Sequence, residues 1–482
     1  MPPPQPTAAR SQPGAAPPGA WPALWALCLG FFMVLVDSTI VAVAVPSIMA
    51  GLGTDIATTV WASSAYLLAF AVPLLITGRL GDSLGPKRVY MAGLVVFTLS
   101  SLACGLAGTI GMLIAARVVQ GLGASLMNPQ TMAIITRLFP ARRRGAALGM
   151  WGAVAGAATL AGPLLGGLLV GTLGWQWIFF VNVPLGFLAL ALAWRLVPDL
   201  PRTARRLDLP SVLLSAAAMF LVVFAIQEGQ RYDWGRIIGL VTVPGMLAAG
   251  VVLLVVFVVR QRRLAGGALM PLSLFAQRNF TLAAIAISTM GLAMTSMFLP
   301  LMVYLQDGRG LDAMGASLLI VPVAVLSGVL APVVGRVIDR IDARLVAVPS
   351  LLLLAGATAG LGWLMAVDAS LDLMLVPLAL IGLANAGIWS PLSTTATRGL
   401  AAEVAGAGAG VYNTTRQTGA VLGSAGIAAL MEVRLRSLAA AGDPGAFSVA
   451  MGQSLLLPAL AVAGGAVAAM FLRPGHDRVP GQ

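Results

Sequence analysis

The stretch GRLGDSLGPKR at residues 78–88 lies between two long apolar runs. It combines helix-breaking glycines, one acid at Asp82 and a cluster of three basic residues. A second stretch, GRVIDRIDAR at residues 335–344, also separates two apolar runs, and its first five positions repeat this spacing. The residues that correspond are Gly78, Arg79 and Asp82 in the first stretch and Gly335, Arg336 and Asp339 in the second. A charged hinge at corresponding places in a membrane chain predicts two related halves.

The composition of the chain indicates a membrane protein. Of its 482 residues, 59% are hydrophobic and 10% are charged, and the mean hydropathy is +0.94. A soluble domain carries roughly 25% charged residues, so this chain cannot cover itself with a wettable surface. Successive apolar runs separated by short polar links predict an all-α polytopic membrane protein that contacts the lipid bilayer.

Hydropathy predicts about 14 membrane spans. They lie near 21–48, 58–79, 88–107, 111–136, 146–170, 176–197, 211–227, 237–260, 279–305, 312–335, 344–366, 371–396, 405–431 and 448–472. Because the hinges follow the second and tenth spans, two spans are left over between two pseudo-symmetric six-helix bundles. The predicted division is a disordered tail at 1–20, a bundle at 21–197, a linker with two extra helices at 198–265, a bundle at 266–474 and a tail at 475–482.

The loop charges predict the orientation of the chain. The net charge is +12, but the basic residues gather in alternate loops, which is the positive-inside pattern and not a nucleic-acid-binding face. Both termini are therefore expected in the cytoplasm. The inner links carry Arg79, Lys87, Arg88, Arg137, Arg142, Arg143, Arg144, Arg195, Arg202, Arg205, Arg206, Arg260, Arg262, Arg263, Arg278, Arg336, Arg340, Arg344 and Arg398.

Metal chemistry and histidine-based catalysis are not expected. Cys28 and Cys104 both fall in apolar runs without metal-ligand spacing, and the single histidine, His476, lies in the tail. The absence of intramembrane histidine and of clustered carboxylates also argues against a membrane-embedded enzyme. The chain is thus expected to bind no metal and no cofactor.

Three ionisable side chains lie well inside predicted spans: Asp37, Arg117 and Arg416. A charge near the bilayer centre is costly unless it faces a cavity or a partner, so each is a functional-site candidate. An aspartate whose arginine neighbour comes and goes could load and release a proton. The alternative is a permanent structural pair of Asp37 with Arg117.

Three further groups each allow two interpretations. Arg416, with Tyr412 and Asn413 nearby in YNTTRQTG, could line a polar cavity that binds substrate or could only anchor neighbouring helices. A stripe of Met290, Met294 and Met297 with Phe298 could line an apolar pocket or lie in the core. The glycine-rich run that contains Gly149, Gly162, Pro163, Gly166 and Gly167 could allow tight helix packing or act as a pivot between halves.

These residues together resemble the major facilitator superfamily, and within it the fourteen-span drug:proton antiporters. GRLGDSLGPKR resembles the signature between helices 2 and 3, with Ser83 where a basic residue is common. LVDSTIVAVAVPSI at residues 35–48, RVVQGLGASLMNP at 117–129, GMWGAVAGAATLAGPLLGG at 149–167 and GWQWIFFVNVPLG at 174–186 resemble signatures of helices 1, 4, 5 and 6. The resemblance covers nearly the whole chain after residue 20.

The resemblance implies a monomeric, proton-driven exporter of small molecules that works by alternating access. It assigns proton coupling to Asp37 and Arg117, and gating to Gly78, Asp82, Gly85, Lys87 and Arg88 with Gly335, Arg336 and Asp339 in the second half. Gly149, Gly162, Pro163, Gly166 and Gly167 match the antiporter signature, and Gln120 is a candidate substrate-binding residue. Asp312 and Asp372 stand at the very start of their predicted spans and no acid falls well inside the spans of the second half, so Asp37 is the only membrane carboxyl expected. The remaining alternatives are an exporter dedicated to one endogenous metabolite, lipid or siderophore, and a transport-dead membrane sensor.

Overall fold

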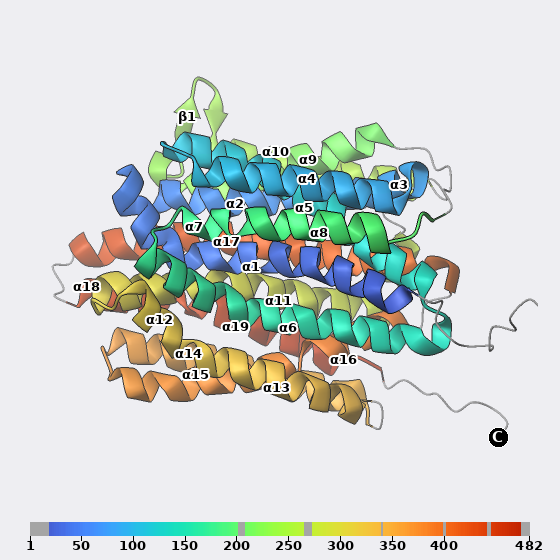
Figure 1. Cartoon of the computed structure of the whole chain (residues 1–482). Coiled ribbons are helices and arrows are strands. Elements are labelled where there is room, and N and C mark those ends of the chain that lie inside the picture. The colour runs from blue at the N-terminus through green and yellow to red at the C-terminus, as the bar shows by residue number, and fades with distance from the viewer. Residues whose placement is uncertain are drawn as a thin grey trace, which may run out of the picture.

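The chain folds into a bundle of long helices that run side by side (Figure 1). This computed structural model describes residues 19–200, 208–264, 272–338, 341–398, 402–440 and 445–473. Within these residues, 12 helical segments are long and apolar enough to cross a membrane, and Ile56–Ala71 and Ala161–Thr172 are shorter apolar helices. The chain is therefore an all-helical, multi-pass membrane protein.

The first part of the chain supplies the helices that surround the candidate site. Their bounds are α1 Ala20–Leu52, α2 Ile56–Ala71, α3 Leu74–Leu84, α4 Pro86–Gly105, α5 Ile110–Leu138, α6 Ala141–Thr172, α7 Trp177–Phe180 and α8 Asn182–Leu196. Side-chain caps fix some starts: Asp55 accepts a hydrogen bond from the Thr58 N–H, and Thr109 accepts one from the Met112 N–H. The predicted span at 58–79 is interrupted, because α2 ends before Pro73 and α3 begins after it.

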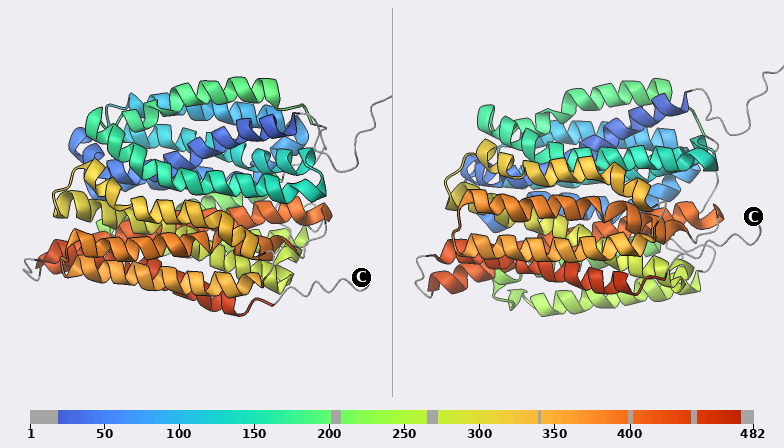
Figure 2. Two further views of the ribbon diagram at one scale, coloured as in Figure 1. Left: turned by 60° about the horizontal axis from the view of Figure 1, so that its bottom comes forward. Right: turned by 90° about the horizontal axis from the view of Figure 1, so that it is seen from below.

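A peripheral pair of helices follows, α9 Leu209–Glu228 and α10 Val243–Arg263. Between them lie a short helix, η1 Gln230–Tyr232, and an antiparallel hairpin of β1 Arg236–Ile238 and β2 Val241–Thr242. The sequence did not predict this hairpin. Gly239 turns it with a φ of 55°. In Figure 2 (right), the yellow-green α10 and the hairpin form one edge of the bundle.

The last part of the chain supplies the remaining helices. Their bounds are η3 Leu272–Ala276, α11 Arg278–Val303, η4 Tyr304–Gly308, α12 Ala313–Leu319, α13 Val321–Ile338, α14 Ala343–Ala366, α15 Leu371–Ala386, α16 Trp389–Arg398, α17 Ala402–Ala440, α18 Ala446–Ser454 and α19 Leu456–Met470. Helix α17 continues well past the predicted span at 405–431. Because η4 extends the α11 span to Gly308, Asp307 lies in its last turn, so the expectation of no acid inside these spans was wrong at that end.

The first predicted hinge is mostly helical, which corrects the expectation of a loop. Gly78 and Gly81 lie inside α3, and only Gly85, with a φ of 99°, breaks the helix before Pro86 starts α4. A Cβ at Gly81 would lie 1.7 Å from Gln130 Oε1, so this glycine permits close contact between α3 and α5. In the second stretch, Gly335 and Arg336 likewise lie in the last turn of α13.

The ends of the bundle differ. Figure 1 shows β1, α12 and α18 at one end, named here the hairpin end, and α3 at the other. In the half of the bundle toward the hairpin end, Ser64 on α2 and Ser424 on α17 share a hydrogen bond of 2.8 Å. In the same half the Gln306 amide donates to the Val43 carbonyl at 3.0 Å. Segments far apart in the sequence are therefore joined in this half.

Candidate functional site

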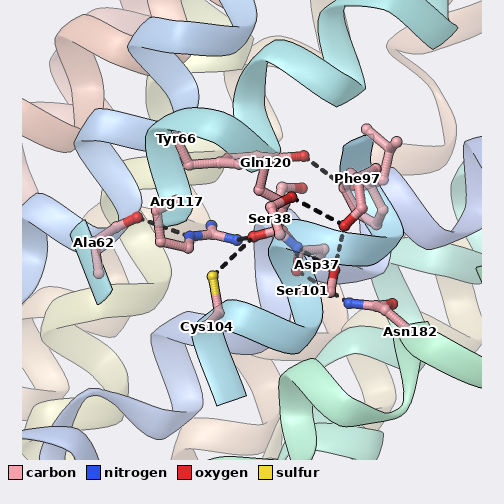
Figure 3. A network of polar contacts seen from close by, with 12 residues as sticks. Asp37, Ser38, Ala62, Tyr66, Phe97, Ser101, Cys104, Arg117, Gln120 and Asn182 are labelled. Atoms are coloured by element: carbon pink, nitrogen blue, oxygen red, sulfur yellow. Dashed lines mark hydrogen bonds and ion pairs between the residues drawn. The ribbon is translucent and has the colours of Figure 1, made fainter. Parts of the chain in front are cut away.

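The candidate site is a fully buried ion pair between Asp37 on α1 and Arg117 on α5 (Figure 3). Both side chains are 0% exposed, and Arg117 Nη1 donates to Asp37 Oδ2. The Arg117 Nε also donates to the Ala62 carbonyl of α2 at 2.9 Å. Asp37 and Arg117 are thus paired, which both predicted alternatives require, and the pair draws on three helices.

Gln120 links the two charged groups. One turn after Arg117 on α5, its Oε1 accepts a hydrogen bond from Arg117 Nη1 at 2.7 Å. Its Nε2 donates to Asp37 Oδ1 at 2.8 Å and to Ser101 Oγ of α4 at 2.7 Å. The amide therefore uses both of its ends, and its orientation is fixed because the Arg117 guanidinium can only donate and the charged Asp37 carboxylate can only accept. Gln120 was predicted to bind substrate, but here it is a partner of the ion pair.

Asn182, the first residue of α8, completes the surroundings of the carboxylate. Its Nδ2 donates to Asp37 Oδ1 at 3.2 Å. With Gln120 on the same oxygen and Arg117 on the other, both carboxylate oxygens have charged or amide donors. Such donors compensate a charge that has been removed from water. Two aromatic rings flank the guanidinium, with its carbon 4.0 Å from the Tyr66 ring centroid and 5.7 Å from that of Phe179.

Glycines on α5 bring the helices of this site into contact. A Cβ at Gly121 would lie 2.4 Å from the Tyr66 carbonyl oxygen of α2, and one at Gly123 would lie 2.6 Å from the Phe97 nitrogen of α4. Neither contact can be relieved by moving a flexible side chain, because both involve backbone atoms. The run GLGA that follows Gln120 therefore sets the distance from α5 to its two neighbours.

Comparison with known proteins shows the family of this chain. Residues 27–424 match the Major Facilitator Superfamily. The chain belongs to the major facilitator superfamily. It is 48% identical, over 94% of this chain and 81% of the relative, to an uncharacterized MFS-type transporter of Mycobacterium tuberculosis. It is 33% identical to the tetracenomycin C resistance and export protein of Streptomyces glaucescens, over 86% and 76% of the two chains.

The fold is also that of solved transporter structures. The crystal structure of a D-xylose-proton symporter matches with a TM-score of 0.67 and 14% identity, covering 94% of this chain and 98% of that chain. At this identity the likeness shows the fold alone. Membership of the major facilitator superfamily makes the chain a membrane transporter. Relatives that are named as resistance or export proteins are about one third identical to it.

The predicted gating residues are placed only in part. Lys87 Nζ donates to the Trp194 carbonyl of α8 at 2.9 Å, and Arg88 is exposed. Gly85 provides the turn between α3 and α4. The side chain of Asp82 and all of Asp339 lie outside the described residues. The gating role of these residues therefore stays a prediction.

The predicted antiporter glycines lie at helix contacts. A Cβ at Gly162 would lie 1.9 Å from Thr39 Oγ1 of α1, and one at Gly167 would lie 2.7 Å from the Ala313 carbonyl oxygen of α12. Gly166 packs on α1 at Ile40, and Pro163 lies inside α6. Gly149 is also on α6, but its surroundings lie outside the described residues. These glycines let α6 lie close to α1 and α12, which is the packing interpretation.

The predicted substrate residues of the second half separate into two groups. Met290, Met297 and Phe298 are buried in the largest hydrophobic cluster, and Met294 packs at its edge. Arg416 and Asn413 lie together on α17, where Arg416 Nε donates to Asn413 Oδ1 at 3.2 Å. The methionine stripe and Tyr412 thus lie in the core, whereas Arg416 and Asn413 form a polar cluster on α17.

The sequence interpretation missed Ser101 and Asn182 as parts of the site. Asn182 stands in GWQWIFFVNVPLG, and Ser101 lies in a predicted span. Each is a polar side chain at a buried position, 0% exposed for Ser101 and 2% for Asn182. A search for polar residues within apolar runs would have found them, because a buried polar group requires a partner.

Proposed function

We propose that this transporter exports amphipathic small molecules, drugs among them, in exchange for protons. The observation that carries the proposal is the buried Asp37–Arg117 pair with its amide donors. A buried carboxyl group beside a guanidinium interacts differently in its two protonation states. The charged Asp37 carboxylate binds Arg117, whereas the protonated carboxyl releases Arg117 and becomes a hydrogen-bond donor.

In the proposed cycle, a proton from outside neutralises Asp37 when the cavity faces outward. Arg117 is then freed from the carboxylate, and the helices that meet at the pair, α1, α2 and α5, can shift relative to one another. Loss of the proton to the cytoplasm restores the pair. Each charge that crosses a 100 mV potential supplies about 2.3 kcal/mol, besides the contribution of the pH gradient. The proton motive force would then drive the cycle without a bound cofactor.

The proposal includes 14 spans in a bacterial cytoplasmic membrane, with both termini in the cytoplasm. The interrupted pair α2 and α3 and the 32-residue α6 would add two spans to the 12 long helices. Each is long enough for a hydrocarbon core of ~30 Å at ~1.5 Å per residue. In this orientation the hairpin end faces outside, and the Ser64–Ser424 bond supports a state closed on that side. The transporter would work as a monomer of two related bundles.

Substrate-driven proton release from acid-loaded proteoliposomes tests the proposal. Wild type, Asp37→Asn and the control Asp372→Asn, an exposed acid at the start of α15, would be compared across lipophilic cations and neutral drugs. We expect release by wild type and the control and none by Asp37→Asn. Full coupling in Asp37→Asn would make the ion pair purely structural.

A second candidate is an exporter dedicated to one compound. It is favoured by the relative from Streptomyces glaucescens, which is named for a single compound, tetracenomycin C. A narrow response in the same assay would support this function. Ligand binding by wild type without any proton movement would instead indicate a membrane sensor.

A further inference from the structure

The second arginine inside the spans, Arg416 on α17, has no acidic partner among the described residues. Protein encloses its guanidinium, yet the side chain keeps part of its surface accessible. The Nε group donates to Asn413 Oδ1 at 3.2 Å, which leaves both Nη groups without a partner in the described part of the chain. Its guanidinium carbon lies 5.4 Å from the centroid of the Trp389 ring on α16.

A second, independent polar group stands beside it. Tyr412 precedes Arg416 by one helical turn and is therefore on the same face of α17. It is 8% exposed, and its hydroxyl has no hydrogen-bond partner among the residues that the structure describes. A buried hydroxyl without a partner is uncommon and requires an explanation. One anionic ligand would satisfy both the hydroxyl and the Nη groups.

The backbone around Arg416 is held firmly. A Cβ at Gly291 of α11 would lie 2.3 Å from the Arg416 carbonyl oxygen, and one at Gly419 would lie 1.9 Å from the Ser288 carbonyl oxygen. These contacts hold α17 against α11 at Arg416 and again at Gly419, about one turn further along. The guanidinium is therefore presented from a fixed position, as a binding site requires.

The charges near the middle of the bundle favour an anion. Asp37 and Arg117 neutralise each other, whereas Arg416 adds a positive charge for which the described residues offer no acidic partner. An unpaired charge within a span is costly and usually marks a substrate pathway. A positive interior also disfavours lipophilic cations, which were among the drug classes that the proposed function includes.

We propose that Arg416 and Tyr412 bind the carboxylate of the exported molecule, with the Trp389 ring beside its apolar part. This inference rests on the proposed function and names its substrate class, amphipathic organic acids. The paired Nη groups match the two oxygens of a carboxylate, and the tyrosine hydroxyl supplies a third donor. An indole ring offers an apolar face to the rest of the ligand.

The charge of the substrate has a consequence for transport. Exchange of one inward proton for one outward monoanion moves two positive charges inward in each cycle. A neutral substrate would move one, and a monovalent cation would move none. Export of an acid should therefore depend most strongly on the membrane potential.

Binding of a matched pair of probes tests the site. The purified chain in phosphatidylcholine nanodiscs would be titrated at neutral pH with 2-naphthylacetate and with its uncharged methyl ester. We expect wild type to prefer the acid by about tenfold or more, the range of a hydrogen-bonded charge pair. Arg416→Gln should lose this preference, Arg416→Lys should keep part of it, and Tyr412→Phe should weaken it several-fold. Arg434→Gln removes an exposed arginine from the same helix and should leave it unchanged.

Equal affinity of wild type for acid and ester, or no binding of either up to millimolar concentration, overturns the inference. The inference is also overturned if Arg416→Gln still prefers the acid to the ester. If Arg416→Gln does not fold, Tyr412→Phe decides: a several-fold loss supports the site, and unchanged preference overturns it. Competition by phosphatidylglycerol that depends on Arg416 would assign the site to a lipid headgroup and overturn the substrate part.

The inference and the proposed function fail separately. Asp37→Asn should retain the acid preference, because Asp37 is not part of the α17 cluster. If the acid binds but no protons are released, only the proposed proton exchange is contradicted and the carboxylate site stands. Proton release with neutral drugs, combined with equal binding of acid and ester, would contradict the carboxylate site alone.

Discussion

Arg117 and Arg416 are the same residue type in two helices of one bundle, and their surroundings differ. Arg117 has a carboxylate, an amide oxygen and a backbone carbonyl as acceptors, and two aromatic rings flank it. Arg416 has one side-chain amide and one ring. The first site is complete without a ligand, whereas the second is not. The difference is that Arg117 already has a carboxylate partner within the protein, whereas Arg416 has none among the described residues and could bind a carboxylate from a ligand.

Removal of the two arginines should give the largest contrast. Arg117→Leu leaves the Asp37 carboxylate buried without its counter-charge and should destabilise the fold by about 3–5 kcal/mol. Arg416→Leu removes an unpaired charge and should change stability little or increase it. Thermal unfolding in detergent measures both, and Asp37→Asn combined with Arg117→Leu should restore most of the loss. An equal loss from Arg416→Leu would make Arg416 a structural anchor.

Helix contacts beside each arginine should give the next largest effect. Gly121→Ala places a Cβ near the Tyr66 carbonyl oxygen, and Gly291→Ala places one near the Arg416 carbonyl oxygen. Each should cost about 1–3 kcal/mol because the backbone must shift. Only Gly121→Ala should also alter the pH dependence of proton release, since it displaces the helix of the ion pair. Gly111→Ala, with open space around it on α5, is the control and should not destabilise the fold.

Loss of the Asn182 amide should have a smaller effect. Asn182→Leu removes one hydrogen bond from Asp37 and should cost about 1 kcal/mol, because Arg117 and Gln120 remain. Asn128→Leu is the matched control, since Asn128 is also buried but neither side-chain polar atom has a partner. That variant should be neutral or stabilising. Denaturation midpoints compare the two, and a greater loss from Asn128→Leu would show that Asn182 does not support the carboxylate.

The smallest effect is expected far from both arginines, at Asp208. Arg260 donates to its carboxylate at 2.8 Å, and this hydrogen bond lowers the pKa of Asp208. Stability from a lowered carboxyl pKa is fully present above the unfolded value of about 3.9 and disappears as the pH falls through the folded value. Asp208→Asn should therefore lower the unfolding temperature slightly at neutral pH and not at all in strong acid. A difference that persists in strong acid would contradict this assignment.

Much of the fold followed from local patterns in the sequence. The apolar runs predicted nearly all of the long helices, since a helix satisfies its own backbone hydrogen bonds in lipid. The hinge at residues 78–88 was predicted as a loop, yet glycines at 78 and 81 stay helical. Their role is to admit a neighbouring helix, and composition does not distinguish close packing from a break. The β1–β2 hairpin was missed because its strands have only three and two residues.

The candidate site was predicted as a pair and observed as a network. Asp37 and Arg117 stood out in the sequence because charges within apolar runs are rare. Gln120 and Asn182 did not stand out, because uncharged amides are common and their partners are set by helix rotation. The same limit applied to Arg416: only the structure separates an arginine with a carboxylate from one without.

The sequence by itself determined that this protein is a helical membrane protein, because its composition excludes a wettable surface and helices need only local hydrogen bonds. Tertiary structure decided which polar groups meet. The Asn182–Asp37 bond joins residues 145 positions apart, and the Gln306–Val43 bond joins residues 263 apart. Such contacts depend on how whole helices rotate and approach one another. That arrangement results from packing across the bundle, so no single stretch of sequence contains it.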